Sequence, residues 1–140
     1  MNNDCSIVSS GIIVVDHVAA PVDHVPAAGE LILTTDCRLH IGGCAANVAI
    51  DLAKLQIRSR VIGCVGDDVF GSFARQTLRA KGVDDSAIRV EPAAPTSQTL
   101  VVNVTGEDRR FVHLIGANGQ FRADDLRNQS WDGVRILYLG

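Results

Sequence analysis

Buried β-branched runs alternate with helical patterns along this chain of 140 residues, and that alternation restricts the fold more than any other feature. Residues 6–15, 60–65 and 135–139 have the near-continuous apolar character of strands that are buried on both faces of a parallel sheet. Helices are predicted over residues 44–55 and 69 to about 81. Strands and helices in this order build a doubly wound α/β fold around a parallel sheet.

Two insertions interrupt this pattern, at about residues 17–40 and 95–115. The second contains strands at residues 98–104 and 110–114, joined by a short turn that predicts a hairpin. Because these strands do not fit the parallel sheet, we expect them to form a small antiparallel β layer or flap beside it.

The predicted parallel sheet is too small to be complete. About three strands are fewer than an open sheet usually has, and the predicted helices barely cover both of its faces. Residues 1–140 are therefore expected to form the first half of a larger α/β domain.

The composition excludes several kinds of partner. A net charge of −3 and an aromatic content of 4% argue against nucleic acid. The sequence has neither a signal-peptide pattern nor an apolar run of the ~18 residues that a membrane span needs. We therefore expect a cytoplasmic protein with no membrane partner.

The four cysteines do not predict a metal site. Cys5, Cys37, Cys44 and Cys64 show neither Cys-x-x-Cys spacing nor a cluster with histidine. In a reducing compartment we expect all four to be small buried side chains.

Candidate site residues gather where a ligand binds in such folds, beyond the carboxyl ends of the strands. Asp16 closes the first predicted strand, and Gly42 and Gly43 precede a helix that has Asn47 in its first turn. A carboxylate accepts hydrogen bonds from neighbouring hydroxyls, and a glycine pair lets a ligand approach the free N–H groups of a helix N-terminus. These residues predict a site for a small polyhydroxylated ligand.

Each of these residues also has a purely structural interpretation. Asp16 could cap a turn, the glycine pair could only make a tight turn, and Asn47 could belong to the solvent-facing stripe of its helix. The glycines are not part of a dinucleotide or Walker motif, because GxGxxG and GxxxxGK[ST] are absent.

Two further features near the predicted strand ends have alternative interpretations. Asp67 and Asp68 could bind a metal or substrate, although helix capping accounts for them well. Cys44 at a helix N-terminus could be a nucleophile, but no His–Asp arrangement is defined around it.

The predicted hairpin carries cations and aromatic residues of open role. Arg109 and Arg110 at its turn could bind an anion or simply be solvated. Phe111 and His113 share one face, which could cover a ligand or pack against another protein chain.

Taken in order, these pieces resemble the N-terminal half of the ribokinase (PfkB-type) family of sugar and nucleoside kinases. The matching segments are GIIVVD (11–16), PAAGE (26–30), GGCAANVA (42–49), GCVGDDVFG (63–71), GVD (82–84), PT (95–96), GEDR (106–109) and GAN (116–118).

The resemblance implies that Asp16, Gly42, Gly43 and Asn47 bind the hydroxyls of a sugar. It also implies that the two insertions form a β lid, which closes over the substrate and often pairs with the lid of a second subunit in a homodimer. Members of this family transfer the γ-phosphoryl group of ATP to a hydroxymethyl group, with Mg²⁺ and an aspartate as general base.

The chain departs from the family pattern in two ways. Gln56 stands where the family usually has glycine after the first helix, so we expect that helix to end with another kind of cap. The segments with the catalytic aspartate and the ATP-binding positions belong to the second half. No residue of this chain is therefore assigned as catalytic base, nucleotide ligand or metal ligand, and residues 1–140 alone are expected to be inactive.

Two functions of different kinds remain open. The first is a sugar kinase of this family, of which the chain carries the sugar-binding and lid half. The second is a non-catalytic sugar-binding or dimerisation module, if the 140 residues are the whole protein. A nicotinamide-dependent dehydrogenase shares the fold class but lacks its glycine fingerprint.

Overall fold

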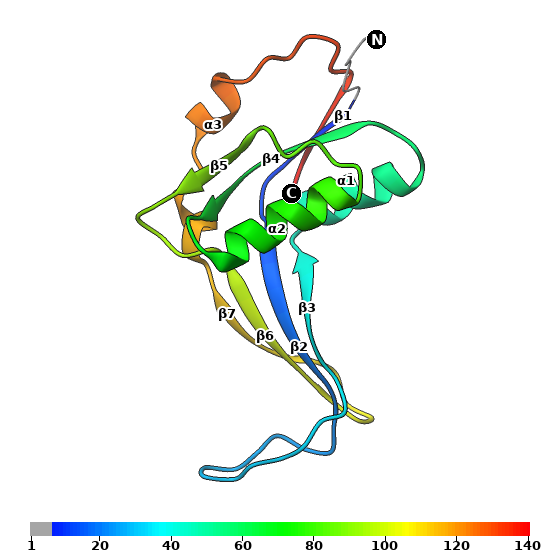
Figure 1. Cartoon of the computed structure of the whole chain (residues 1–140), viewed down its shortest axis with the longest axis vertical. Coiled ribbons are helices and arrows are strands. Elements are labelled where there is room, and N and C mark those ends of the chain that lie inside the picture. Colours follow the sequence, from blue (N-terminus) through cyan, green and yellow to red (C-terminus); the bar gives the residue numbers. More distant parts are fainter. Residues whose placement is uncertain (1–6) are drawn as a thin grey trace.

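The computed structural model describes residues 7–140 and builds them around two β-sheets. A four-stranded parallel sheet has the order β5-β4-β1-β8 and comprises β1 (Ile7–Ser10), β4 (Ser59–Gly66), β5 (Ile88–Glu91) and β8 (Ile136–Leu139). The second sheet has the order β3-β2-β6-β7 and comprises β2 (Val14–Val22), β3 (Cys37–Gly42), β6 (Gln98–Val104) and β7 (Arg110–Leu114). Figure 1 shows this second sheet extending away from the parallel sheet and its helices. The predicted α/β class is confirmed.

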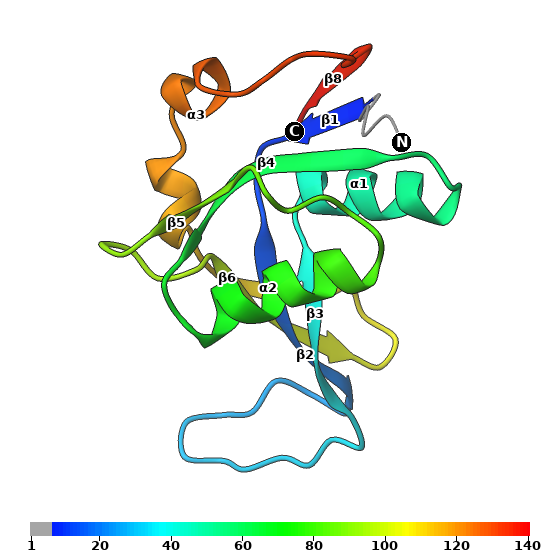
Figure 2. The ribbon, with the colours of Figure 1, turned by 45° about the horizontal axis from the view of Figure 1, so that its top comes forward.

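Helices cover both sides of the parallel sheet. Figure 2 shows α1 (Cys44–Lys54) and α2 (Val69–Ala80) on one side, and α3 (Ala123–Arg127) with the 3₁₀ turn η1 (Gly116–Gln120) on the other. The main core lies beneath the two long helices, where Val61 and Val65 of β4 meet Leu78 of α2 with no exposed surface. Burying a side chain of this size contributes about 1.5–3 kcal/mol.

Residues 6–15 do not form the single strand that the sequence predicts. Within the described residues, β1 ends at Ser10 and β2 begins at Val14 in the other sheet. Gly11 makes the break with a φ of 142°, and a side chain there would collide with the carbonyl oxygen of Gly140. Because β2 continues to Val22, Asp16 lies inside a strand rather than at its end.

Other elements also differ from the sequence predictions. The strand β5 was not predicted, so the parallel sheet has four strands instead of about three. In the second sheet the β2–β3 and β6–β7 pairs are antiparallel as expected, but β2 and β6 pair in parallel. After β7, residues Gly116–Gln120 form the 3₁₀ turn η1 and Ala123–Arg127 form the short helix α3.

The expectation that all the cysteines are buried is wrong for two of them. Cys37 and Cys44 are exposed free thiols, whereas Cys64 is buried, and Cys5 lies outside the described residues. Cys37 begins an exposed strand and Cys44 begins α1 at the point where that helix meets the second sheet, so neither position lies in the core.

The two long helices end with the same kind of cap, although Gln56 led us to expect a different cap for α1. After α2, Gly82 has a φ of 83°, its N–H bonds the Arg79 carbonyl, and the Val83 N–H bonds the Leu78 carbonyl. These two bonds make a Schellman cap. After α1, Gln56 adopts the same left-handed conformation with a φ of 62° and equivalent hydrogen bonds, so a side chain occupies a position that favours glycine.

Candidate functional site

Asp16 and Gly42 are packed together at the junction of the two sheets. In the β2–β3 pair, Val14 stands opposite Gly42 and Asp16 stands opposite His40. A side chain added at Gly42 would collide with the Asp16 carboxylate. Residue 42 must therefore be glycine for this carboxylate to keep its place.

Gly43 and Asn47 continue this site into α1. Gly43 is the N-cap residue with a φ of 91°, and a side chain there would collide with the Ile12 carbonyl. No side chain caps α1 and its first turn has no acidic residue, so the N–H groups at this helix end can bind an anionic or hydroxylated ligand. Asn47 lies one turn along, where its N–H bonds the Gly43 carbonyl and its side chain is exposed.

The structure thus joins Asp16, Gly42 and Gly43 directly, and it places Asn47 one helical turn away. Asn47 also lines a shallow hollow of about 390 Å³ together with His40, Lys54 and Lys81. Asp16 is not among the residues that line it, so this hollow is not by itself the ligand site.

Asn118 fixes the backbone between the two sheets. Its side-chain oxygen accepts the Ile13 N–H at 3.2 Å, and its side-chain nitrogen donates to the Ile13 carbonyl at 2.9 Å. This pair of bonds holds the chain where it leaves β1 and enters β2, three residues before Asp16. The sequence showed Asn118 only as part of a Gly-Ala-Asn segment, because the partner lies 105 residues away.

Asp68 caps α2, as one of the two sequence interpretations predicted. Its carboxylate accepts the Gly71 N–H at 2.8 Å, the Thr96 N–H at 2.8 Å and the Thr96 hydroxyl at 2.6 Å. Partial burial opposes its ionisation, but the bonds from Thr96 and Gly71 outweigh it and hold the pKa of Asp68 below its ordinary value. Asp68 therefore ties α2 to the segment that begins β6.

A row of polar residues crosses the second sheet at the level of Asp16. The strand registers place His40, Asp16, Thr99 and His113 side by side on one face. The Thr99 hydroxyl lies 3.0 Å from Nδ1 of His113, which confirms that their side chains share that face. Sequence reasoning singled out His113 but missed Thr99, because strand register sets this neighbourhood.

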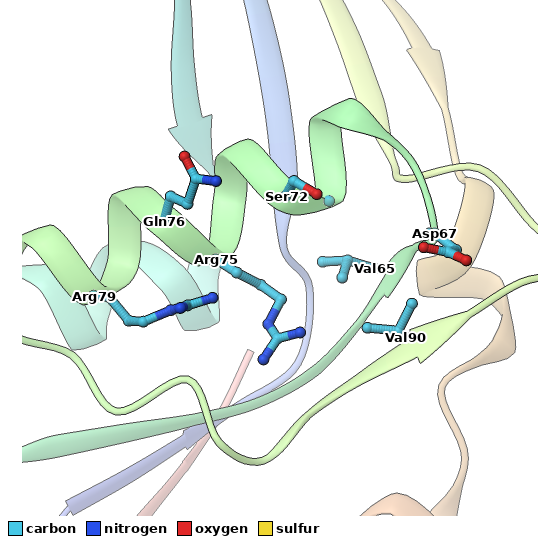
Figure 3. Close-up of a pocket in the computed structure, with 9 residues that line it drawn as sticks. Val65, Asp67, Ser72, Arg75, Gln76, Arg79 and Val90 are labelled. Carbon is cyan, nitrogen blue, oxygen red and sulfur yellow. The ribbon is translucent and has the colours of Figure 1, made fainter.

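A separate cavity of about 120 Å³ lies between α2 and β5, where β4 ends (Figure 3). Arg75 and Arg79 line it. Arg75 donates through Nε to the Asp85 carboxylate at 2.8 Å, and Arg79 forms an ion pair with the same carboxylate, with its Nε at 3.1 Å. Asp67 stands on the opposite wall, so the cations of this cavity are balanced by carboxylates. We interpret these ion pairs as structural contacts that hold α2 against the segment before β5.

Among residues 7–140, no group of three or more His, Cys, Asp or Glu side chains is arranged to hold a metal ion. No helix in that part of the chain has the length and apolar character needed to cross a membrane.

Comparison with known proteins shows the family and the fold. The family model described as pfkB family carbohydrate kinase matches residues 5–139, which is nearly the whole chain. The chain belongs to the pfkB family of carbohydrate kinases. The resemblance to the ribokinase (PfkB-type) family, which the order of the sequence motifs suggested, is thereby confirmed.

Curated relatives of this pfkB chain are kinases. It is 38% identical over 96 residues to an aminoimidazole riboside kinase of Salmonella typhimurium, covering 64% of this chain and 30% of that protein. It is also 38% identical over 127 residues to an ATP-dependent ribose-1-phosphate kinase of Halopiger xanaduensis, covering 85% of this chain and 41% of that protein. The chain therefore spans well under half the length of these relatives.

Solved structures show the same fold. An Arabidopsis thaliana ribokinase complexed with ribose and ATP matches with a TM-score of 0.81 at 24% identity, covering 96% of this chain and 44% of that one. At this identity the likeness shows the shared fold.

Proposed function

We propose that the full-length protein is a sugar kinase, which transfers the γ-phosphoryl group of ATP to a hydroxymethyl group of a sugar or related polyol. In this proposal the present chain supplies the sugar-binding part. The observation that carries it is the Asp16 carboxylate, held in the space beside Gly42 and next to the uncapped N-terminus of α1. A carboxylate and free N–H groups together bind the hydroxyls of a sugar from two sides.

Asp16, Gly42, Gly43 and Asn47 are the proposed substrate residues. Asp16 accepts hydrogen bonds from sugar hydroxyls, the two glycines leave room for the ligand against the backbone, and Asn47 offers an amide one turn into α1. The second sheet acts as a lid in this proposal, and its closure excludes water from phosphoryl transfer.

ATP and Mg²⁺ are the proposed co-substrate and metal ion. Two ribokinases with the same fold were solved with ADP and with ribose and ATP, which supports the choice of nucleotide. When bound, the metal would neutralise charge on the transferred phosphoryl group. We assign neither the catalytic base nor the nucleotide-binding residues to this chain, and we propose that these 140 residues alone are inactive. A cytoplasmic location is part of the proposal, because that compartment supplies ATP.

We further propose that the second sheet pairs with a second copy in a homodimer. Four apolar residues lie on the face opposite Asp16 and are 42–68% exposed: Leu39, Leu100, Val112 and Leu114. Exposed apolar side chains grouped on one face in this way favour burial against another surface. Leu100→Asp should convert a dimer into monomers in analytical ultracentrifugation, and a wild-type protein that sediments as a monomer would contradict the proposal.

The kinase proposal is tested by incubating the full-length protein with ATP, Mg²⁺ and a panel of sugars and sugar acids, and measuring ADP and phosphorylated product. We expect at least one sugar to be phosphorylated. Sugar binding without any phosphorylation would favour the non-catalytic binding module instead. If no sugar is bound or phosphorylated, the proposal is wrong.

A further inference from the structure

The sheet face that carries Asp16 also carries side chains that can bind a ligand. Strand register places Arg38 and His40 from β3 and Phe111 and His113 from β7 on this face. Asp16 is the one carboxylate that the four strands contribute to it.

Arg109 adds a cation without an acidic partner at the β7 side of this face. Its guanidinium lies over the ring of Phe111, 5.6 Å from the ring centroid. Asp108 accepts a hydrogen bond from the Arg109 backbone rather than from its guanidinium. In the part of the chain that the structure describes, Arg109 forms no ion pair, whereas Arg38 forms one with Asp36. Stacking on Phe111 orients the Arg109 guanidinium while leaving its N–H groups available.

His113 is held in position on β7, four residues along the chain from Arg109. The contact between its Nδ1 and the Thr99 hydroxyl fixes the ring and leaves Nε2 for a ligand. Arg109 therefore offers guanidinium N–H groups and His113 offers Nε2, both on the β7 side of this face.

The separation of these groups matches a sugar. Two strand spacings lie between Asp16 on β2 and His113 on β7, which is about 10 Å. A five- or six-carbon chain with one hydrogen bond at each end can bridge such a gap.

We propose that the substrate bound at Asp16 is a sugar that carries an acidic group, a carboxylate or a phosphate, and that Arg109 and His113 bind this group. The inference rests on the proposed function, because it takes Asp16 as the residue that binds the sugar hydroxyls. Asp16 then holds the hydroxyl end of the substrate, and the β7 side of the sheet selects acidic sugars over neutral ones.

The test measures binding to the full-length protein by isothermal titration calorimetry with two matched pairs of probes. Gluconate against glucose tests a carboxylate, and ribose 1-phosphate against ribose tests a phosphate. We expect one of the acids to bind about tenfold or more tightly than its neutral partner, as a charge-assisted hydrogen bond implies.

Arg109→Gln should abolish this preference and leave the affinity for the neutral sugar unchanged. His113→Gln replaces the imidazole with a neutral side-chain amide and should reduce the preference. Arg110→Gln is the matched control, because Arg110 lies on the opposite face of the same hairpin and pairs with Glu107. The Arg110→Gln variant should keep the full preference.

Neutral sugars that bind as tightly as both acids would overturn the inference while leaving the kinase proposal intact. An equal loss of acid binding in Arg109→Gln and Arg110→Gln would also overturn it, because only a general charge effect would then remain. If no sugar of either kind binds, both the inference and the proposed function fail.

Discussion

The carboxylate of Asp16 lies against Gly42, in the space that any side chain at residue 42 would occupy. This contact explains why the two residues belong to one site although 26 positions separate them in the sequence. It also couples β2 to the turn that leads into α1 through Gly43.

Gly42→Ala is expected to weaken sugar binding through this contact. The added methyl group would collide with the Asp16 carboxylate and displace it. Because binding depends on the position of this carboxylate, we expect the affinity for the sugar to fall about tenfold or more. Calorimetric titration of the full-length protein measures the effect. Gly119→Ala is the control, because its methyl group would meet only the side chain of Ile115. If the loss is as large in the Asp16→Ala background as in the wild type, Gly42 does not act through Asp16.

Gln56→Gly is expected to stabilise the protein. Gln56 holds a left-handed conformation that costs a side-chain-bearing residue roughly 1–2 kcal/mol, and the extra freedom of glycine in the unfolded chain offsets part of the gain. The free energy of unfolding should rise by about 0.5–1 kcal/mol. Gly82→Ala makes the opposite change at the equivalent position of α2, where an added Cβ meets no atom within 4 Å, and it should lower stability. Equal stabilities for Gln56→Gly and the wild type would show that this helix end is unstrained.

Thr96→Val is expected to destabilise the connection between α2 and the second sheet. Thr96 is fully buried, and its hydroxyl donates to Asp68 and accepts the Gly66 N–H at 2.9 Å. Valine keeps the shape but leaves both groups without this partner, at a cost of about 2–3 kcal/mol. Ser97→Ala removes only one bond, to the Leu114 carbonyl, and should cost less. Chemical denaturation measures the free energy of unfolding of both variants. A smaller loss of stability in Thr96→Val than in Ser97→Ala would contradict the proposed role of the Thr96 hydrogen bonds.

Asp125→Asn is expected to reduce the sensitivity of the protein to acid. Burial opposes ionisation of Asp125, but hydrogen bonds from Arg89 and the Arg122 backbone outweigh it and hold the pKa of Asp125 below its ordinary value. A carboxyl whose pKa is lowered by folding contributes stability above about pH 4, and this contribution disappears as the pH falls through its folded pKa. The wild-type Tm should therefore fall below about pH 4 more steeply than that of Asp125→Asn.

Asp124→Asn is the control for this experiment. Asp124 is exposed and pairs only with Arg127 one turn along α3, so its removal should leave the acid response close to that of the wild type. Parallel Tm curves for the wild type and Asp125→Asn would show that the Arg89–Asp125 pair does not carry the acid sensitivity.

The sequence predicted elements well where a local pattern specifies them. The helix cap at Asp68, the hairpin after Gln98 and the parallel strand β8 each follow from residues close together in the chain. The break at Gly11 could not be predicted in this way, because the contacts that make it come from Gly140 and Asn118.

The candidate site shows the same limit. The sequence placed Asp16 at the end of a strand, whereas the structure places it inside β2, yet its closeness to Gly42 was correctly expected from the order of elements. Thr99 and the stacking of Arg109 on Phe111 escaped prediction, because they depend on the register between β2, β6 and β7.

The affinity of the full-length protein for its sugar, compared between the wild type and Asp16→Ala, tests the central claim most directly. Loss of a charged acceptor should weaken binding by about 2–4 kcal/mol, while Asp51→Ala, which removes an exposed carboxylate from α1, should have no effect. Unchanged affinity in Asp16→Ala would contradict the assignment of Asp16 and, with it, the site at the junction of the two sheets.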